Sequence, residues 1–255
     1  MYAIKCTEVS KEYRSFFSKP CLALDNFSAQ IHEKKITALL GANGAGKSSL
    51  MRLIAAIEYP SSGFIEVNGY SVLEHSLEVK KQIGFMSESA DFYPELGVHE
   101  FLMLGKKLRK LPQENIDWAI NICALEEVLS KKIQTLSKGY VQRLSLAQAL
   151  LHKPSILILD EPSSGLDPAQ SITFKKLIKN LHTTTLFSSH STSEIEEIAD
   201  DVLVLNRGTL VFSGSIESLL EKTDETKLEK AYIRLLSETA LEEAKGFEDE
   251  KGVGL

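Results

Sequence analysis

A glycine-rich segment, GANGAGKS, occupies residues 41–48. It follows an apolar run at 36–42 and precedes a helical stripe of apolar residues at 50–57, which is the setting of a phosphate-binding loop. Glycines let the backbone N–H groups turn inward, and a helix N-terminus adds positive potential for an anion. We predict that Lys47 reaches the terminal phosphates of a nucleotide and that the Ser48 hydroxyl ligates Mg²⁺. The alternative is a glycine turn without nucleotide, and the strand, loop and helix in register argue against it.

Two adjacent acids follow a second apolar run, in the segment ILILDEP at residues 156–162. Asp160 ends the run at the carboxyl end of an expected strand, where open α/β sheets place their ligand sites. A carboxylate there would hold Mg²⁺ through water. Glu161 comes next, and we predict that it polarises the attacking water. Alternatively, Asp-Glu-Pro merely ends a strand in a turn, and the apolar run before it argues against that interpretation.

The segment LSKGYVQR at residues 136–143 places a Ser-x-Gly turn at the start of an expected helix. Ser137 alone would serve as an N-cap, which contributes about 1 kcal/mol to a helix. The same helix end attracts an anion through its dipole. Both roles use the same geometry, so Ser137 can have both.

Together these three segments resemble the ATP-binding cassette (ABC) ATPases, and the resemblance covers roughly residues 2–235. In that family two chains sandwich ATP and drive the movement of something else. The resemblance therefore implies an ATP-hydrolysing motor subunit with ATP and Mg²⁺ at its site and a second ABC subunit as partner, expected to be an identical copy. The family's signature usually reads LSGGQ. Here Lys138 and Tyr140 depart from it, while Ser137 and Gly139, the residues best suited to contact phosphate, are kept.

The resemblance assigns further residues one by one. SSGLDP at 163–168 resembles the loop that crosses the dimer interface, and His190 matches the histidine that touches the γ-phosphate. Tyr13 matches the aromatic residue that stacks on adenine, although it could be an ordinary strand aromatic. The expected catalytic residues are Glu161, His190 and Lys47, and the expected Mg²⁺ ligands are Ser48, Glu88 and Asp160. The expected nucleotide-binding residues are Tyr13, Gly41, Ala42, Asn43, Gly44, Ala45, Gly46, Lys47, Ser48, Ser49, Ser137 and Gly139.

Glu88 is a departure, because most of the family has Gln there, in contact with Mg²⁺ and the membrane partner. A carboxylate is a stronger Mg²⁺ ligand than an amide. Its extra negative charge near the γ-phosphate is unfavourable unless the metal is bound. We therefore expect Glu88 to join the metal shell and to tighten the Mg²⁺ dependence.

Several details look most like the ATPase subunits of type-two ABC exporters: Glu88, the stretch at 90–102, LSKGY, and the tail at 227–238. This resemblance implies an integral membrane permease as partner. Its contacts would be the apolar residues Phe92, Tyr93, Pro94 and Leu96, which could instead pack inward. The alternative function is a soluble ABC ATPase of an assembly or regulatory complex without a membrane partner.

Composition limits the remaining possibilities. The 255 residues carry a net charge of −6 and no block of basic residues, which disfavours nucleic acid as a partner. No apolar run approaches the roughly 18 residues that cross a bilayer, and the N-terminus lacks the apolar core of a signal peptide. We expect a cytoplasmic protein held at the inner face of the cell membrane by its partner. The three cysteines are expected to be small buried residues.

The order of elements predicts an α/β fold of the P-loop NTPase type, with a mostly parallel sheet, an N-terminal antiparallel β portion and a helical subdomain insert at about 89–136. The ATPase domain is expected to span 1–235, followed by an acidic, flexible tail at 236–255. Strands are expected at 3–9, 27–31, 36–42, 64–70, 156–160 and 183–189, and a β-hairpin at 202–214.

Overall fold

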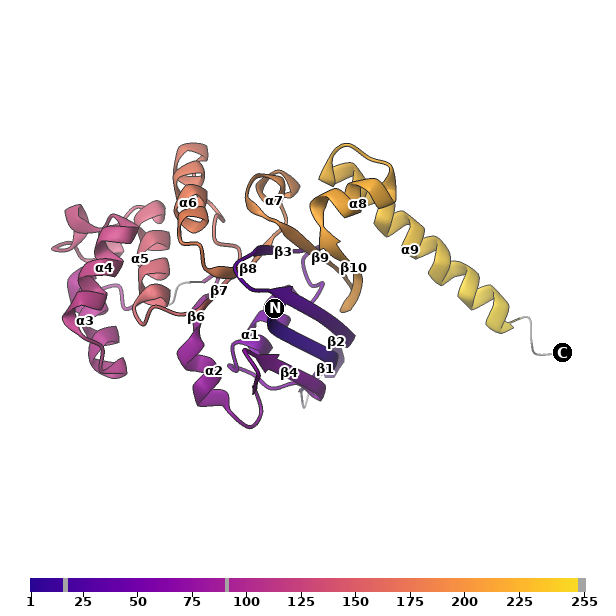
Figure 1. The fold of residues 1–255 in the computed structure, drawn as a ribbon, viewed down its shortest axis with the longest axis horizontal. Coiled ribbons are helices and arrows are strands. Elements are labelled where there is room, and N and C mark those ends of the chain that lie inside the picture. The colour runs from indigo at the N-terminus through magenta and orange to yellow at the C-terminus, as the bar shows by residue number, and fades with distance from the viewer. Residues whose placement is uncertain (16–17, 90–91, 252–255) are drawn as a thin grey trace.

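The computed structural model describes residues 1–15, 18–89 and 92–251, with side chains for 1–14, 19–89 and 92–239 (Figure 1). The expectations for Ala90, Asp91 and residues 252–255 lie outside the described residues. Within the described ranges, no helix is both long and apolar enough to cross a bilayer.

A six-stranded sheet of order β10-β9-β3-β8-β7-β6 carries the site. Five strands are parallel neighbours, and β10 pairs antiparallel at one edge. Successive residues of β7 face opposite cores. Ile156 and Ile158 pack into the core that contains α1 (Lys47–Ile54), whereas Leu157 and Leu159 pack into the core formed with the helical part. The strands are β3 (Ile36–Leu40), β6 (Ile83–Met86), β7 (Ile156–Leu159), β8 (Thr184–Ser189), β9 (Asp201–Asn206) and β10 (Thr209–Ser215). The predicted parallel sheet and its terminal hairpin are confirmed.

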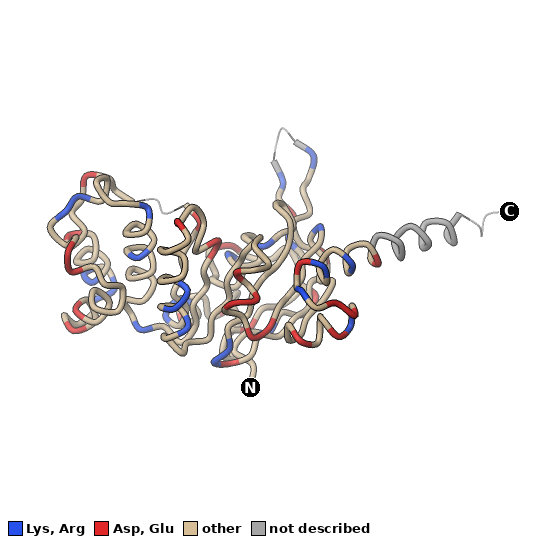
Figure 2. The backbone as a smooth tube through the Cα atoms, turned by 90° about the horizontal axis from the view of Figure 1, so that it is seen from above, with Lys and Arg blue, Asp and Glu red and all other residues tan. Residues whose placement is uncertain are grey.

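A second sheet, of order β2-β1-β4-β5, is antiparallel and packs over α1 (Lys47–Ile54). Its strands are β1 (Tyr2–Ser15), β2 (Ser18–His32), β4 (Ser62–Val67) and β5 (Tyr70–Ser71). The first two strands are much longer than the runs at 3–9 and 27–31 suggest, and their hairpin stands away from the body (Figure 2). Figure 2 also shows Lys and Arg interspersed with Asp and Glu along the chain.

The helical part lies at one end of the molecule (Figure 1). Two of its helices fall in the predicted insert, and α5, which follows the insert, packs against them in the same core. The helices between α1 and β8 are α2 (Ser76–Gln82), α3 (Val98–Arg109), α4 (Gln113–Cys123), the 3₁₀ turns Glu126–Val128 and Ile133–Thr135, α5 (Lys138–Leu150) and α6 (Pro168–Asn180).

The last helices are α7 (Thr192–Ile198), α8 (Ile216–Thr223) and α9 (Leu228–Lys251). Helix α9 begins against α7 and α8 and then extends from the body (Figure 1). Its backbone is helical to Lys251, which differs from the loose chain expected after residue 236. Glu, Ala, Leu and Lys are strong helix formers, and Arg234 bonds Glu238 one turn on at 3.3 Å, so the acidic composition is compatible with a helix.

A histidine joins the helical part to the sheet. Arg109 of α3 donates from Nη1 to Nδ1 of His152 at 2.7 Å, and Nε2 of His152 donates to the Ile83 carbonyl at 3.0 Å. Because Nδ1 of His152 accepts a hydrogen bond, it carries no proton and the imidazole must be neutral. Burial, followed by the charge of Arg109, lowers the pKa of His152 from 6.5 to about 4.

We therefore predict that the protein loses stability when the pH falls from about 6.5 to about 4. In this window the unfolded chain binds a proton at His152 and the folded chain does not, so acidification favours unfolding. The midpoint of urea denaturation, measured at pH 7 and pH 5, should fall less in His152→Gln than in the wild type. Equal falls in the two proteins would assign the acid sensitivity to other groups.

Candidate nucleotide-binding site

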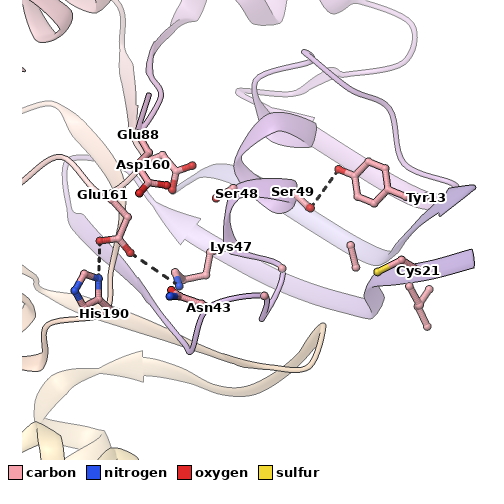
Figure 3. Close-up of a pocket in the computed structure, with 14 residues that line it drawn as sticks. Tyr13, Cys21, Asn43, Lys47, Ser48, Ser49, Glu88, Asp160, Glu161 and His190 are labelled. Atoms are coloured by element: carbon pink, nitrogen blue, oxygen red, sulfur yellow. Dashed lines mark hydrogen bonds and ion pairs between the residues drawn. The ribbon is translucent and has the colours of Figure 1, made fainter. Parts of the chain in front are cut away.

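A cavity of about 680 Å³ opens beside the phosphate loop (Figure 3). It lies where β3, β7 and β8 end, and the β1–β2 hairpin and the segment after β6 complete it. Its lining consists of Tyr13, Cys21, Leu22, Ala23, Asn43, Gly44, Gly46, Lys47, Ser48, Ser49, Glu88, Asp160, Glu161 and His190. The structure thus brings together predicted residues from five separate parts of the chain.

The Lys47 ammonium group lines this cavity and is held by the phosphate loop itself. Nζ donates to the carbonyl oxygens of Gly41 at 2.8 Å and Ala42 at 3.2 Å, and the side chain is 7 % exposed. Gly46, directly before it, has φ +103°, a backbone conformation that favours glycine. The loop therefore keeps the ammonium group at the cavity by hydrogen bonds to neutral carbonyl oxygens, which an anionic phosphate can replace.

The two acids after β7 both line the cavity, and Ser188 of β8 fixes them. Its hydroxyl donates to Asp160 Oδ1 at 2.6 Å and accepts from the Glu161 N–H at 2.8 Å. Glu161 has φ +46°, in the left-handed region that few non-glycine residues occupy. Adjacent residues of a strand point to opposite faces. The left-handed turn ends this alternation, and both carboxylates reach the same cavity.

Ser188→Ala should reduce the kcat of nucleotide hydrolysis about tenfold, because it removes both bonds that orient the acid pair. It should also lower the free energy of unfolding by about 1–3 kcal/mol, since the Glu161 N–H loses its partner. The matched control is Ser189→Ala. The Ser189 hydroxyl donates to Glu194 Oε2 at 2.6 Å instead of to the acid pair. The control should lose comparable stability but little kcat. Equal losses of kcat in both variants would show that Ser188 has no specific role in orienting the acid pair.

Glu161 makes further contacts inside the cavity. Its Oε2 lies 3.0 Å from Nδ1 of His190, and its Oε1 lies 4.0 Å from Nζ of Lys47 (Figure 3). The Glu161 side chain is 12 % exposed, whereas that of His190 is 67 % exposed. The three residues predicted to be catalytic therefore lie together, with the histidine on the open side.

Tyr13 and Cys21 lie at the other end of the cavity, directly opposite each other in the β1–β2 register (Figure 3). The Tyr13 hydroxyl donates to Glu58 Oε2 at 2.7 Å and lies 3.2 Å from Ser49 Oγ. These bonds fix an aromatic ring beside the phosphate loop, at the end of the cavity away from His190.

The three predicted Mg²⁺ ligands, Ser48, Glu88 and Asp160, line the same cavity. Hydroxyl and carboxylate oxygens are the hard donors that Mg²⁺ prefers, usually together with waters and substrate phosphates. Over the described ranges, no group of three or more His, Cys, Asp and Glu side chains could hold a metal by itself. The donors fit a Mg²⁺ ion shared with a bound nucleotide.

Five predicted residues do not line the cavity. Gly41, Ala42 and Ala45 belong to the loop but do not face the cavity, and Ser137 and Gly139 lie at the start of α5. Ser137 occupies the N-cap position of α5, as the sequence suggests, but its hydroxyl makes no capping hydrogen bond.

Sequence reasoning missed four residues of the site: Cys21, Leu22 and Ala23 on β2, and Ser188 on β8. The expectation that all cysteines are buried is correct for Cys6 and Cys123 and wrong for Cys21, which is exposed. The cause is the unexpected length of β2, which places Cys21 on the outer part of the hairpin. Burial raises the pKa of the Cys6 and Cys123 thiols to about 12.

Comparisons with known proteins identify the family. A family model described as ABC transporter matches residues 24–164. The uncharacterized ABC transporter ATP-binding protein YdbJ of Bacillus subtilis is 35% identical over 83% of this chain and 69% of its own length. The bacitracin transport ATP-binding protein BcrA of Bacillus licheniformis is 35% identical over 82% of this chain and 68% of its own length.

Solved structures share the fold. The ATP binding subunit of an ABC transporter matches with a TM-score of 0.81 at 24% identity, over 92% of this chain and 99% of that chain. The dimeric bacterial ABC transporter cassette MJ0796 matches with a TM-score of 0.75 at 22% identity, over 84% of this chain and 98% of that chain.

The parallel sheet, the glycine loop at a helix N-terminus and the acid pair after a neighbouring strand define a nucleoside triphosphatase of the phosphate-loop class. The chain belongs to the ABC transporter family and is one of its ATP-hydrolysing, ATP-binding subunits. The family resemblance drawn from the sequence is confirmed at this level.

Proposed function

We propose that this chain is the motor subunit of an ABC exporter and works as a nucleotide-sandwich dimer. The dimer is inferred from the position of the turn at Ser137 and Gly139, where α5 begins. Ser137 is exposed at the start of α5 and does not line the cavity of its own chain. A helix end suited to an anion would therefore meet the nucleotide of a second copy.

The residues around the cavity support ATP hydrolysis in distinct ways. Lys47 and the loop N–H groups bind and orient the phosphates, and Tyr13 stacks on adenine. Glu161 accepts a proton from the attacking water, while its bond to His190 keeps the carboxylate in place. Mg²⁺, held by Ser48, Asp160 and Glu88, would neutralise phosphate charge when bound.

Glu88→Gln should raise the Mg²⁺ concentration for half-maximal ATP hydrolysis about three- to tenfold, because an amide is a weaker ligand than a carboxylate. The measurement is a Mg²⁺ titration at fixed ATP, with Glu74→Gln as control. Glu74 is exposed and does not line the cavity. An unchanged Mg²⁺ dependence would show that Glu88 is not a ligand.

The membrane partner is proposed to be an integral permease, which would hold this chain at the cytoplasmic face of the membrane. Similarity to proteins named for bacitracin transport supports a transporter. Of the four apolar residues expected to meet the permease, Phe92 and Leu96 pack partly into the core, whereas Pro94 is exposed and Tyr93 is 65% exposed. Leu108 of α3 is 75% exposed as well, so Tyr93 and Leu108 are the proposed contacts.

The proposal is tested with Glu161→Gln, which should bind ATP, hydrolyse it slowly and trap the closed dimer. The variant is recovered with MgATP from cells solubilised in mild detergent, and its companions are identified by mass spectrometry. A stoichiometric membrane protein with several spans is the expected result. Exclusively soluble companions would favour the alternative function, an ABC ATPase of an assembly or regulatory complex. The direction of transport is tested separately, by comparing cargo efflux from cells that carry the wild-type protein with efflux from cells that carry Glu161→Gln.

A further inference from the structure

A charged cluster beside the cavity holds the ring of Tyr13. The cluster consists of Lys11 on β1, Arg52 on α1 and Glu58 in the turn after α1. Lys11 Nζ lies 3.3 Å from Glu58 Oε2, and Arg52 Nη1 lies 3.6 Å from Glu58 Oε1. Each oxygen of the Glu58 carboxylate therefore has its own cation. The three residues lie beside the cavity and do not line it.

The cluster binds Tyr13 at its hydroxyl group. The phenol donates to Glu58 Oε2 at 2.7 Å, a length typical of a hydrogen bond to an ionised carboxylate. Burial alone would raise the pKa of Glu58, but the hydrogen bonds from Tyr13 and Lys11, together with nearby positive charge, lower it. The Tyr13 hydroxyl also lies 3.2 Å from Ser49 Oγ, in the first turn of α1. The ring is therefore fixed to both ends of that helix.

The ammonium group of Lys11 also lies over one face of the Tyr13 ring. Its Nζ is 4.9 Å from the ring centroid, within the range of a cation–π contact. The same Nζ donates to the Tyr59 carbonyl oxygen at 2.9 Å, which keeps the ammonium group in this place. Lys11 therefore occupies one face of the ring and leaves the other face for a stacked base.

Helix α1 joins the cluster to the phosphate loop. The helix begins at Lys47, and its interior residues are buried in the core beneath the antiparallel sheet. The turn that follows it is held by the Arg52 carbonyl oxygen, which accepts from the Ile57 N–H at 2.9 Å and the Glu58 N–H at 3.2 Å. One end of this helix therefore holds the phosphate-binding lysine, and its other end carries the carboxylate that holds the ring.

We propose that Glu58 is a positioning residue that fixes the Tyr13 ring relative to the phosphate loop, and that the nucleotide base stacks on the ring face opposite Lys11. Glu58 does not line the cavity, so it acts on the base through Tyr13. Because the ring is already ordered, a base that binds to it does not bear the entropic cost of ordering it. The inference rests on the proposed function, since it requires a nucleotide in this cavity.

Tyr13→Phe and Glu58→Ala are the direct tests, because the first removes the donor of one hydrogen bond and the second removes its acceptor. Each should raise the dissociation constant of MgADP, measured by calorimetry, about three- to tenfold, as expected for one hydrogen bond. The dissociation constant of magnesium pyrophosphate, which has no base, should stay within about twofold. The KM for ATP should rise while kcat changes by less than about twofold, because the ring holds the base equally before and during hydrolysis.

Two single variants and one double variant serve as controls. Glu58→Gln keeps an oxygen that can accept from the Tyr13 hydroxyl, so it should restore most of the affinity for MgADP. Glu74→Gln changes an exposed acid that does not line the cavity and should leave binding unchanged. Tyr13→Phe combined with Glu58→Ala should bind MgADP little more weakly than either single variant, because both remove the same bond. Additive losses would overturn the role of Glu58 in holding Tyr13.

The inference and the proposed function fail in different ways. Unchanged MgADP affinity in Tyr13→Phe and Glu58→Ala, with the wild type binding normally, would overturn the positioning role and leave the proposed function intact. Equal losses for MgADP and magnesium pyrophosphate would also overturn it, because the substitutions would then act on the phosphate loop as a whole. No MgADP binding by the wild type would contradict the proposed function itself.

Discussion

Glu161→Gln should reduce the kcat of ATP hydrolysis about 100- to 1,000-fold and leave MgATP affinity within about threefold of the wild type. The amide has the shape of the carboxylate but cannot accept a proton from water. The left-handed backbone at Glu161 and its N–H bond to Ser188 are main-chain features, so both should survive the change. The lower kcat would therefore come from the loss of the proton acceptor and not from a displaced side chain.

The measurement is steady-state phosphate release together with equilibrium binding of MgATP, for the variant and for Glu74→Gln. The control removes an equal charge outside the cavity and should retain full activity. A variant with a kcat near that of the wild type would exclude Glu161 as the base. In that case His190, whose Nδ1 lies 3.0 Å from Glu161, would be the next residue to replace.

The phosphate loop could be predicted because all of its parts are close in sequence. Strand β3 ends at Leu40 and α1 begins at Lys47. The glycine-rich segment and the apolar residues on either side of it therefore belong to one local strand–loop–helix unit. Asp160 and Glu161 could be predicted for the same reason, as the residues that follow an apolar run. What the sequence conceals is the contact between distant strands. Ser188 meets the acid pair only because β7 and β8 pair in register, with Leu159 opposite Phe187.

Strand lengths were the least predictable feature of the fold. Polar residues interrupt the apolar pattern of β1 and β2, whose outer half is held by pairing and not by burial, so the position of Cys21 opposite Tyr13 could not be foreseen. Strand β6 escaped prediction because it has four residues and contains Gly84. That glycine has a packing reason, since a Cβ there would lie 2.4 Å from the Ala149 carbonyl oxygen of α5. The helix comes close to the strand only where a side chain is absent.

Gly46→Ala should abolish nucleotide binding and lower the free energy of unfolding by about 2–5 kcal/mol. Two separate costs combine at this position. Its φ of +103° is strained for any L side chain, and a Cβ would lie 2.3 Å from the Ala23 carbonyl oxygen of β2. Because that oxygen belongs to the backbone of a paired strand, the loop must move away from the hairpin, and Lys47 must move with it.

Gly44→Ala separates the two costs, because Gly44 has φ +80° but nothing within 4 Å of its Cβ position. It should lose only the conformational term, about 1–2 kcal/mol. Urea denaturation of both variants, with MgADP binding measured on the folded protein, gives the comparison. Equal losses of stability would attribute the whole effect to backbone conformation, and the contact with Ala23 would then have no role. A larger loss in Gly46→Ala would mean that the hairpin sets the position of the phosphate loop, which links the Tyr13 end of the cavity to the end at Lys47.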